Sequence, residues 1–422
     1  MRPSLVAVVA LVAAFVGGSG ALLLGKATGW TDGDGETIVE QVAGGAAALP
    51  AAETETDARG DAVRPLLGNE FDPGRIYRER AGGVVTVYAL FEGHGEEGAE
   101  GAAQGSGFVV SRDGYVLTNS HVISTAGQDP SDGDLDGDDP RAGTRPASRV
   151  YVEFRDGDRA EASIVGWDIF DDVGVIKVDP RAHSLRPIPL GDSSRVQVGE
   201  PVVAIGSPFG HAGSITAGIV AATERSVDSL TSDYALVDAI QTDAPINRGN
   251  SGGPLIDARG FAIGINAQIN SETGIAEGVG FAVPINAAVR SMEQLIATGE
   301  VRYAWAGISA QTVTPGLARR FELPAARGAA IQRVVSESPA EAAGLRAGTD
   351  VREFAGAQIE VGGDLIVAID GEPVQDADDV VRAITARRPG DRVRFTVLRG
   401  ERRLAITVEL GERPSERPGP DR

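Results

Sequence analysis

The sequence contains no cysteine and almost no lysine. Without cysteine, a thiol nucleophile, a disulfide framework and thiolate metal sites are all excluded. Lys26 and Lys177 are the only lysines, so arginine supplies nearly all positive charge, which a salt-rich habitat or a genome rich in G and C explains equally well. Acidic residues (60) outnumber basic ones (39), giving a net charge of −21. This excess argues against a nucleic-acid-binding protein, whose binding surface is basic.

An apolar run opens the chain, from Leu5 to Leu24. About 20 apolar residues can cross a bilayer as a helix. A cleaved signal peptide is the alternative, but it has a shorter apolar region and an Ala-x-Ala-like site, which Gly17–Ala21 matches poorly. We therefore favour an uncleaved signal anchor over residues 1–26, with the amino terminus inside. This predicts a single-pass cell-membrane protein with its folded part outside the cytoplasm, the alternative being a secreted or periplasmic protein.

The length of 422 residues indicates two or more domains. Residues 27–71 are rich in Ala, Gly, Asp, Glu and Thr without sustained periodicity, which is typical of a flexible acidic linker. Residues 411–422 form a polar, proline-rich stretch that we expect to be disordered. We expect the folded part to comprise a first domain over residues 72–300 and a second over residues 301–410.

Short strands with glycine turns dominate the first domain. Val84–Phe91 is a continuous β-forming run, and apolar segments flank the turns at Asp113-Gly114, Asp156-Gly157 and Arg259-Gly260. Such spacing favours a β-barrel or a β-sandwich. The second domain mixes elements. Ser338–Glu341 is a capping box with proline at the first helical position, Asp376 and Asp379 can start a second helix, and strands follow that helix.

The segment Asn247–Pro254, Asn-Arg-Gly-Asn-Ser-Gly-Gly-Pro, is the strongest candidate for chemistry. A serine is a poor nucleophile unless a base takes its proton and nearby donors stabilise the oxyanion. The glycines permit a tight turn, which can aim the N–H groups of Gly249 and Ser251 at one point beside the Ser251 hydroxyl. Alone, this segment could equally be a structural turn.

Two upstream motifs favour a catalytic role for this segment over a structural turn. Thr118–Val122 contains His121, and Asp171 and Asp172 precede a Val-Gly-Val run. The order His, Asp, Ser is one of the known orders of a catalytic triad. The other histidines, His94 and His183 among them, lie in polar or glycine-rich segments and are most simply surface residues.

With these motifs in place, the chain resembles the HtrA/Deg family of trypsin-like serine proteases with one C-terminal PDZ domain. The resemblance covers roughly residues 72–410. Six motifs carry it: Gly105–Phe108, Thr118–Val122, Asp172–Val175, Ala204–Gly210, Gly249–Pro254 and Gly280–Pro284. It implies a mainly β fold, with a chymotrypsin-like double β-barrel that carries the active site in the cleft between the barrels. An α+β PDZ domain follows it in the sequence.

The resemblance also assigns roles. It implies His121 as the general base, Ser251 as the nucleophile and Asp172 as the orienting carboxylate, with Asp171 as a competitor that the family spacing disfavours. The candidate oxyanion loop is Gly249, Asn250 and Ser251. Neither a metal nor a cofactor is needed for this acyl transfer.

Segments near the candidate triad predict the substrate preference of the enzyme and its regulation. The region that carries an acidic residue in enzymes cutting after Arg or Lys is Pro245-Ile246 here, which predicts an apolar pocket of modest size. The predicted pocket comprises Ile246, Gly264, Ile265, Asn266 and Ala267. Arg225 matches a sensor-loop arginine that relays ligand binding to the oxyanion loop, or is simply a solvated arginine.

The PDZ resemblance places its carboxylate-binding loop at Trp305, Ala306, Gly307 and Ile308. Residues 349–361 form an insertion relative to that family. A separate acidic stretch around Asp132, Asp134 and Asp136 matches the start of a calcium loop, but the expected Glu at position twelve is Gly143. A solvated acidic insertion is the competing interpretation.

Three functions remain open at this level. The chain could be an ATP-independent endopeptidase that degrades unfolded or misfolded exported proteins, a non-proteolytic chaperone or scaffold, or a processing protease for one signalling substrate. All three triad members are present, which favours a protease. The family further implies peptide C-termini as PDZ ligands, membrane attachment through the N-terminal helix, a homotrimer and no nucleic-acid partner.

Overall fold

The computed structural model describes residues 71–91, 101–126, 144–207, 213–232, 234–247, 249–267, 279–354 and 356–414. The expected membrane anchor, nearly all of the linker, the candidate calcium loop and the last eight residues lie outside these ranges. No helix within the described ranges is long and apolar enough to cross a membrane.

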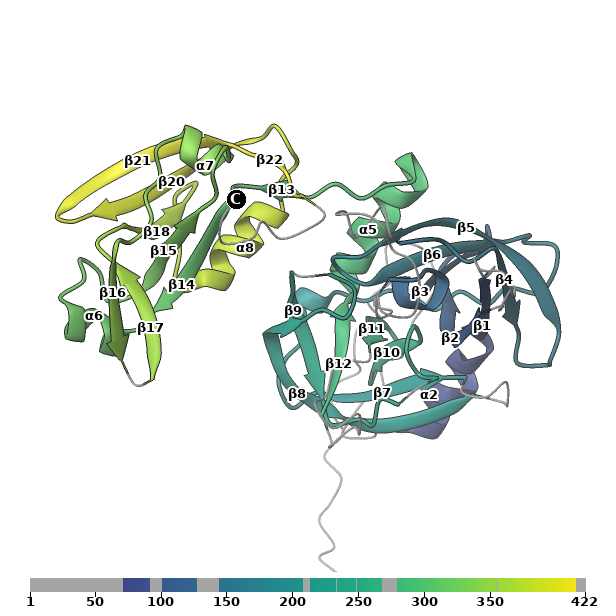
Figure 1. The fold of residues 1–422 in the computed structure, drawn as a ribbon. Coiled ribbons are helices and arrows are strands. Elements are labelled where there is room, and N and C mark those ends of the chain that lie inside the picture. Colours follow the sequence, from purple (N-terminus) through teal and green to yellow (C-terminus); the bar gives the residue numbers. More distant parts are fainter. Residues whose placement is uncertain are drawn as a thin grey trace, which may run out of the picture. The chain divides into compact units, whose positions relative to one another are not determined.

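The first domain consists of two closed β-barrels (Figure 1). The first barrel has the strand order β1-β2-β3-β6-β5-β4. Its strands are β1 (Val84–Phe91), β2 (Gly101–Val109), β3 (Tyr115–Thr118), β4 (Arg149–Glu153), β5 (Arg159–Asp168) and β6 (Val173–Val178). The second barrel has the order β10-β11-β12-β9-β8-β7. Its strands are β7 (Pro201–Gly206), β8 (Ser214–Asp228), β9 (Ala235–Thr242), β10 (Pro254–Asp257), β11 (Ala262–Ala267) and β12 (Gly280–Pro284).

Short helices cap and connect these strands. They are α2 (Pro73–Arg80), η1 (Ala81–Gly83), α3 (Ser120–Ile123), η3 (Ser193–Arg195) and α5 (Ile285–Thr298). Helix α2 begins where the Asp72 carboxylate accepts the N–H of Arg75 at 2.9 Å. Helix α5 ends at Gly299, whose left-handed backbone (φ 78°) suits glycine.

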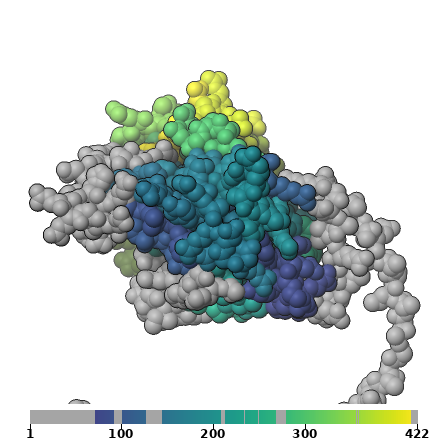
Figure 2. Space-filling model, turned by 90° about the vertical axis from the view of Figure 1, so that its right-hand side faces the viewer, coloured from purple at the N-terminus to yellow at the C-terminus, as the bar shows by residue number. Residues whose placement is uncertain are grey.

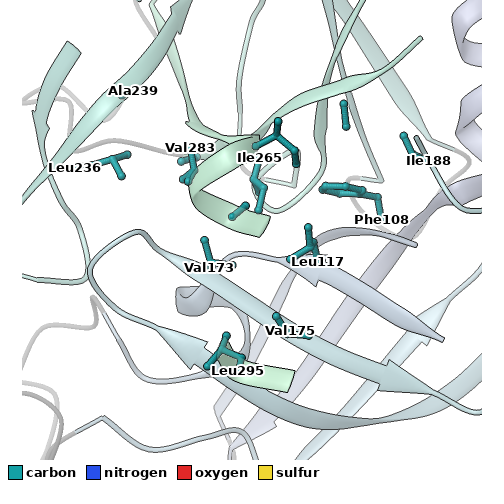
Figure 3. Close-up of a cluster of buried hydrophobic side chains, with 14 of the residues drawn as sticks. Phe108, Leu117, Val173, Val175, Ile188, Leu236, Ala239, Ile265, Val283 and Leu295 are labelled. Carbon is teal, nitrogen blue, oxygen red and sulfur yellow. The ribbon is translucent and has the colours of Figure 1, made fainter. Parts of the chain in front are cut away.

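A shared apolar core joins the barrels to helix α5. Figure 3 shows Phe108, Leu117 and Val175 of the first barrel in the same cluster as Ile265 and Val283 of the second. Burial of such side chains is the main favourable term in folding. Residues 179–200, which connect the two barrels, are mostly exposed or half-buried. The centre of the face in Figure 2 is blue to teal, the colours of the first barrel and of this connecting segment.

The second domain is built on a five-strand sheet path β14-β15-β18-β20-β21, with β19 beside β18 (Figure 1). Its strands are β13 (Ala304–Trp305), β14 (Ile308–Val313), β15 (Gly328–Val334), β16 (Asp350–Phe354), β17 (Ala357–Val361), β18 (Asp364–Ile369), β19 (Glu372–Pro373), β20 (Arg392–Arg399), β21 (Arg402–Glu409) and β22 (Gly411–Glu412). Its helices are α6 (Pro315–Phe321), α7 (Pro339–Ala342) and α8 (Ala377–Thr385). The predicted mainly β protease domain and α+β second domain are confirmed.

The caps expected in the second domain form as their residues dictate. Ser338 accepts the N–H of Glu341 at 3.3 Å, and Asp376 accepts the N–H of Asp379 at 2.8 Å. The Glu341 carboxylate, however, accepts the N–H of Glu337 rather than that of the capping serine. The inserted segment 349–361 is an antiparallel hairpin of β16 and β17.

Two contacts lie at the edges of the expected second domain. Gly411 and Glu412 pair with Trp305 and Ala304 as β22, so the ordered chain continues past residue 410 because these backbone groups complete a strand pair. At the other end, Tyr303 packs into the core of the first domain and is 3% exposed. The first domain therefore extends beyond residue 300.

Candidate active site

His121 lies on α3, the single turn that follows β3. The strand ends at Thr118, whose hydroxyl donates to the carbonyl of Ser106 at 2.7 Å and ties the turn to β2. The His121 side chain is 22% exposed, so one edge of the ring is reachable from outside.

The Asp172 carboxylate faces this imidazole. Its Oδ2 lies 2.8 Å from Nδ1 of His121, and its Oδ1 accepts the Ser120 hydroxyl at 2.7 Å and the His121 N–H at 3.2 Å. Asp171 instead lies 3.0 Å from the Arg290 guanidinium. Asp172, and not Asp171, is therefore the carboxylate in contact with the histidine.

The contact between Asp172 and His121 decides which ring nitrogen carries the proton. An ionised carboxylate only accepts, so Nδ1 of His121 is the donor and Nε2 is left to act as a base. Burial alone would lower the pKa of His121, but the charge of Asp172 and its hydrogen bond outweigh burial and raise the pKa above its ordinary value.

Ser251 lies in a tight turn between two glycines with left-handed backbones, Gly249 (φ 103°) and Gly252 (φ 85°). A Cβ on Gly252 would lie 2.1 Å from the carbonyl oxygen of Ser106, so only glycine fits. The Ser251 carbonyl accepts the N–H of Ser106 at 2.8 Å, which joins the turn to the strand that also supports His121. The Ser251 hydroxyl is buried and has no hydrogen-bond partner among the described residues.

The oxyanion loop is held by Ser106. The Ser106 hydroxyl donates to the carbonyl of Gly249 and accepts the N–H of Ser207 at 2.8 Å. The N–H of Asn250 donates to Asn247 at 2.9 Å, so it is already engaged. The N–H groups of Gly249 and Ser251 have no partner among the described residues, which makes them the candidate oxyanion donors.

The expected pocket residues are closely packed. Ile246 is 6% exposed, Ala267 is 5% exposed, and Ile265 and Asn266 are fully buried. Ile265 contributes to the core between the barrels. The Asn266 amide donates to the carbonyl of Pro254 at 3.1 Å and so braces the strand behind Ser251.

Gly264 approaches the neighbouring strand β12. A Cβ on Gly264 would lie 2.8 Å from the carbonyl oxygen of Val283. Apart from Asn266, whose amide is hydrogen-bonded to Pro254, the predicted pocket residues are therefore apolar, and all are tightly packed.

The predicted sensor arginine and the predicted peptide-binding loop lie in different domains. Arg225 lies within β8, and its guanidinium donates to the side chain of Gln241 on β9 at 3.1 Å. The predicted PDZ loop connects β13 to β14, with Gly307 at φ 81°. Carbonyls of Ala306 and Gly307 accept N–H groups of Ala340 and Val335, so they are not available to a ligand.

A groove lies beside this loop. In the second domain it is lined by residues of the loop, of β14 and of α8: Ala304, Trp305, Ala306, Gly307, Ile308, Ser309, Ala310, Ala377, Asp378, Val380, Val381 and Ile384.

Sequence reasoning missed several residues of the site. Ser120 contacts the candidate residue Asp172 and Ser106 contacts the candidate residue Ser251, although only their positions inside the matched motifs hinted at a role. Asp168 and Tyr303 lie near Asp172 with no local signal in the sequence. Within the described ranges, no group of three or more His, Asp or Glu residues could hold a metal ion.

Comparisons with known proteins agree with this geometry. Residues 105–265 match the model of the trypsin-like peptidase domain, and residues 306–410 match that of the PDZ domain. A relative from Brucella suis biovar 1 (strain 1330), named "Probable periplasmic serine endoprotease DegP-like", is 36% identical over 315 residues. A relative of the same name from Hahella chejuensis (strain KCTC 2396) is 37% identical over 317 residues.

Coverage differs between these relatives and the solved structures. The matched region is 75% of this chain but 54% of the Brucella protein and 59% of the Hahella protein, so the chain spans about half the length of the curated relatives it matches. The structure of the HtrA-type protease AlgW with a tripeptide is 32% identical, with a TM-score of 0.63, over 83% of this chain and 99% of that one. A serine endoprotease from Yersinia pestis is 29% identical, with a TM-score of 0.54, over 81% of this chain and 98% of that one. The chain belongs to the HtrA-type serine proteases, with a trypsin-like peptidase domain followed by one PDZ domain.

Proposed function

We propose that this protein is a serine endopeptidase that hydrolyses peptide bonds of unfolded or misfolded proteins outside the cytoplasm. The contact between His121 and Asp172, 2.8 Å apart, carries this proposal because it leaves Nε2 of the ring as a base. Ser251 reaches the same region through the hydrogen bond between its carbonyl and the N–H of Ser106. The relatives named as periplasmic endoproteases support the compartment.

The reaction proceeds by acyl transfer in two steps. Nε2 of His121 takes the proton of Ser251 as Oγ attacks the peptide carbonyl, and the N–H groups of Gly249 and Ser251 stabilise the oxyanion. His121 then gives the proton to the leaving amine, so the C–N bond breaks and an acyl-enzyme remains. Water attacks this ester with His121 again as the base. Each oxyanion donor contributes roughly 3–4 kcal/mol in comparable sites.

The geometry describes a state in which the nucleophile is not yet engaged. The Ser251 hydroxyl has no partner among the described residues, although hydrogen bonds of a catalytic site often tighten only once substrate is bound. We infer that binding of substrate, or of a ligand to the PDZ domain, brings the Ser251 hydroxyl into hydrogen-bond contact with His121. Arg225 is the proposed relay, and Gln241 is its resting partner.

The PDZ domain is the proposed binding site for C-terminal or extended peptides. Such peptides add to the edge of a sheet, with a carboxylate held by backbone N–H groups. The apolar groove beside β14 and α8 offers such an edge. Attachment to the membrane through residues 1–26 and assembly into a homotrimer are further parts of this proposal.

Unfolded β-casein tests the proposal directly. The purified full-length chain is expected to degrade casein, whereas its Ser251→Ala variant is expected to leave it intact. Degradation by both proteins would point to a contaminating protease, and by neither, even with added C-terminal peptides, would favour a binding protein. Identification of proteins trapped by Ser251→Ala then separates quality control, with many substrates, from processing of one target.

A further inference from the structure

The catalytic carboxylate is carried on a strained backbone. Asp172 has φ 50°, a left-handed conformation that is uncommon outside glycine. Such conformations cost of order 1–3 kcal/mol and persist where the surroundings enforce them. The Asn119 side chain, which donates to the carbonyl of Asp172 at 2.9 Å, enforces one side of this turn.

The other side begins at Asp168, the last residue of β5. Its Oδ1 accepts the N–H groups of Phe170 at 2.9 Å and Asp171 at 3.4 Å, so the carboxyl group closes the turn that leads to Asp172. Its Oδ2 accepts the hydroxyl of Ser291, on helix α5, at 2.7 Å. Asp168 is 2% exposed, so these contacts are shielded from water.

Tyr303 bridges two carboxyl groups of this turn. Its hydroxyl oxygen lies 2.5 Å from Oδ2 of Asp168 and 2.7 Å from Oδ2 of Asp171. A phenol has one proton and donates only once. Both short contacts are hydrogen bonds only if one carboxyl group is protonated and donates to the tyrosine oxygen.

The surrounding charges decide which carboxyl group holds that proton. Arg290 on helix α5 lies 3.0 Å from Asp171 and favours its ionised form. Burial, followed by the charge of Asp171, raises the pKa of Asp168 to about 6. The guanidinium of Arg413 lies 4.9 Å from the centre of the Tyr303 ring rather than beside Asp168, so it does not favour the ionised form of Asp168. Of the two carboxyl groups, Asp168 is therefore the one that burial and the neighbouring charge drive toward the protonated form.

We propose that Asp168 and Tyr303 are positioning residues for the catalytic site: the contacts of the Tyr303 hydroxyl with Asp168 and Asp171 hold the turn that sets Asp172 against His121. This inference rests on the proposed peptidase activity. It assigns a role in the reaction to a tyrosine that lies 131 positions after Asp172 and that the matched motifs do not include.

Three substitutions in the full-length chain test it. Tyr303→Phe removes only the bridging hydroxyl. Asp168→Asn supplies an amide that can donate to the Tyr303 oxygen, as the protonated acid does, and keeps an oxygen for the backbone N–H groups of the turn, whereas Asp168→Ala removes these contacts. Tyr115→Phe is the matched control, because its hydroxyl contacts only the Lys177 ammonium among the described residues, on the far end of β3.

Turnover of labelled β-casein is measured per serine titrated with a fluorophosphonate, so unfolded protein does not count. At a pH at which His121 is unprotonated, Tyr303→Phe and Asp168→Ala are expected to lower kcat about tenfold with KM changed less than twofold, while Asp168→Asn and Tyr115→Phe stay within twofold of the wild type. Unchanged kcat in Tyr303→Phe, or an Asp168→Asn variant as slow as Asp168→Ala, would overturn the proposal.

A second readout does not depend on turnover. The proton shared by Nδ1 of His121 and Asp172 gives a low-field proton NMR resonance, which Tyr303→Phe is expected to shift or broaden and Asp168→Asn to preserve. An unmoved resonance in Tyr303→Phe contradicts the positioning role. If the wild-type protein neither cleaves casein nor reacts with the fluorophosphonate, the proposed peptidase activity is wrong. The NMR resonance still tests the positioning role in that case.

Discussion

Nδ1 of His121 and Oδ2 of Asp172 lie 2.8 Å apart, and the second carboxylate oxygen is bound by the Ser120 hydroxyl at 2.7 Å. The aspartate thus has no freedom to rotate away from the ring. One orientation of the imidazole follows, with Nε2 directed away from Asp172. The first prediction concerns this pair.

Asp172→Asn is expected to lower kcat by roughly 10⁴-fold, because the amide stabilises the wrong tautomer of the imidazole. Asparagine tolerates the left-handed backbone, so the turn itself should survive. Asp171→Asn is the matched control, and its loss should be at least a hundredfold smaller. Steady-state kinetics of casein cleavage compare the two, and equal losses would return Asp171 as a candidate for the triad.

The pH dependence of kcat/KM follows from His121. Its pKa is raised above 6.5 because the Asp172 charge and hydrogen bond outweigh burial. A protonated ring cannot act as the base, so activity is expected to fall as the pH drops through a value above 6.5. The profile of kcat/KM reports the free enzyme. His183→Gln should leave the inflection in place, and an inflection below 6.5 would contradict the assignment.

Stability should also depend on pH through Asp168. Its folded-state pKa is about 6, above the ordinary value of 3.8, so the folded state binds the proton more tightly than the unfolded state. The associated stability is present below about pH 4 and is lost as the pH rises to about 6, by roughly 3 kcal/mol. Urea unfolding of the wild type between pH 4 and 7 measures this loss. In Asp168→Asn the loss should disappear, and an identical slope in both proteins would refute it.

Ser106 is predicted to support the oxyanion loop. Its hydroxyl links Gly249 to Ser207, and removal leaves the partly buried Gly249 carbonyl without this donor. Such a loss costs about 1–3 kcal/mol. Ser106→Ala is therefore expected to lower kcat about tenfold or more with little change in KM. Ser148→Ala, an exposed serine bonded to Leu90, serves as the control and should cleave casein at the wild-type rate.

Gly307 is predicted to be essential for the PDZ loop. A Cβ there would lie 2.2 Å from Cβ of Ser338 in a backbone with φ 81°. Gly371 has a similar left-handed backbone with nothing within 4 Å, so alanine there meets strain alone. Gly307→Ala should abolish binding of a fluorescent C-terminal peptide, whereas Gly371→Ala should retain it with about 1 kcal/mol lower stability. Equal binding by both variants would remove the loop from the proposed site.

Much of the fold could be predicted because its signals are local. The strand Val84–Phe91 appears with the expected bounds, and the caps at Ser338 and Asp376 form because each side chain reaches an N–H three residues ahead. Helix α5 and the short helix α2 were not anticipated. The residues that α5 buries, Ile285, Ala288, Ser291 and Leu295, recur at helical spacing, so the signal for this helix was present in the sequence.

The candidate site divides in the same way. The order of His121, Asp172 and Ser251 and the glycines around the serine are properties of the sequence, because tight turns and nucleophile chemistry require particular residue types. The choice of Asp172 over Asp171 is visible in space, where only one of the two faces the ring.

The sequence by itself determined the family and predicted the two folded units and the candidate triad, since all three depend on short motifs that act over a few positions. Only the tertiary structure decided that Ser106 holds the oxyanion loop and that Tyr303 bridges Asp168 and Asp171. These contacts join residues more than 100 positions apart, and a protonated carboxyl group arises only where burial and a neighbouring charge act together. Neither burial nor that proximity exists until the barrels and helix α5 have packed.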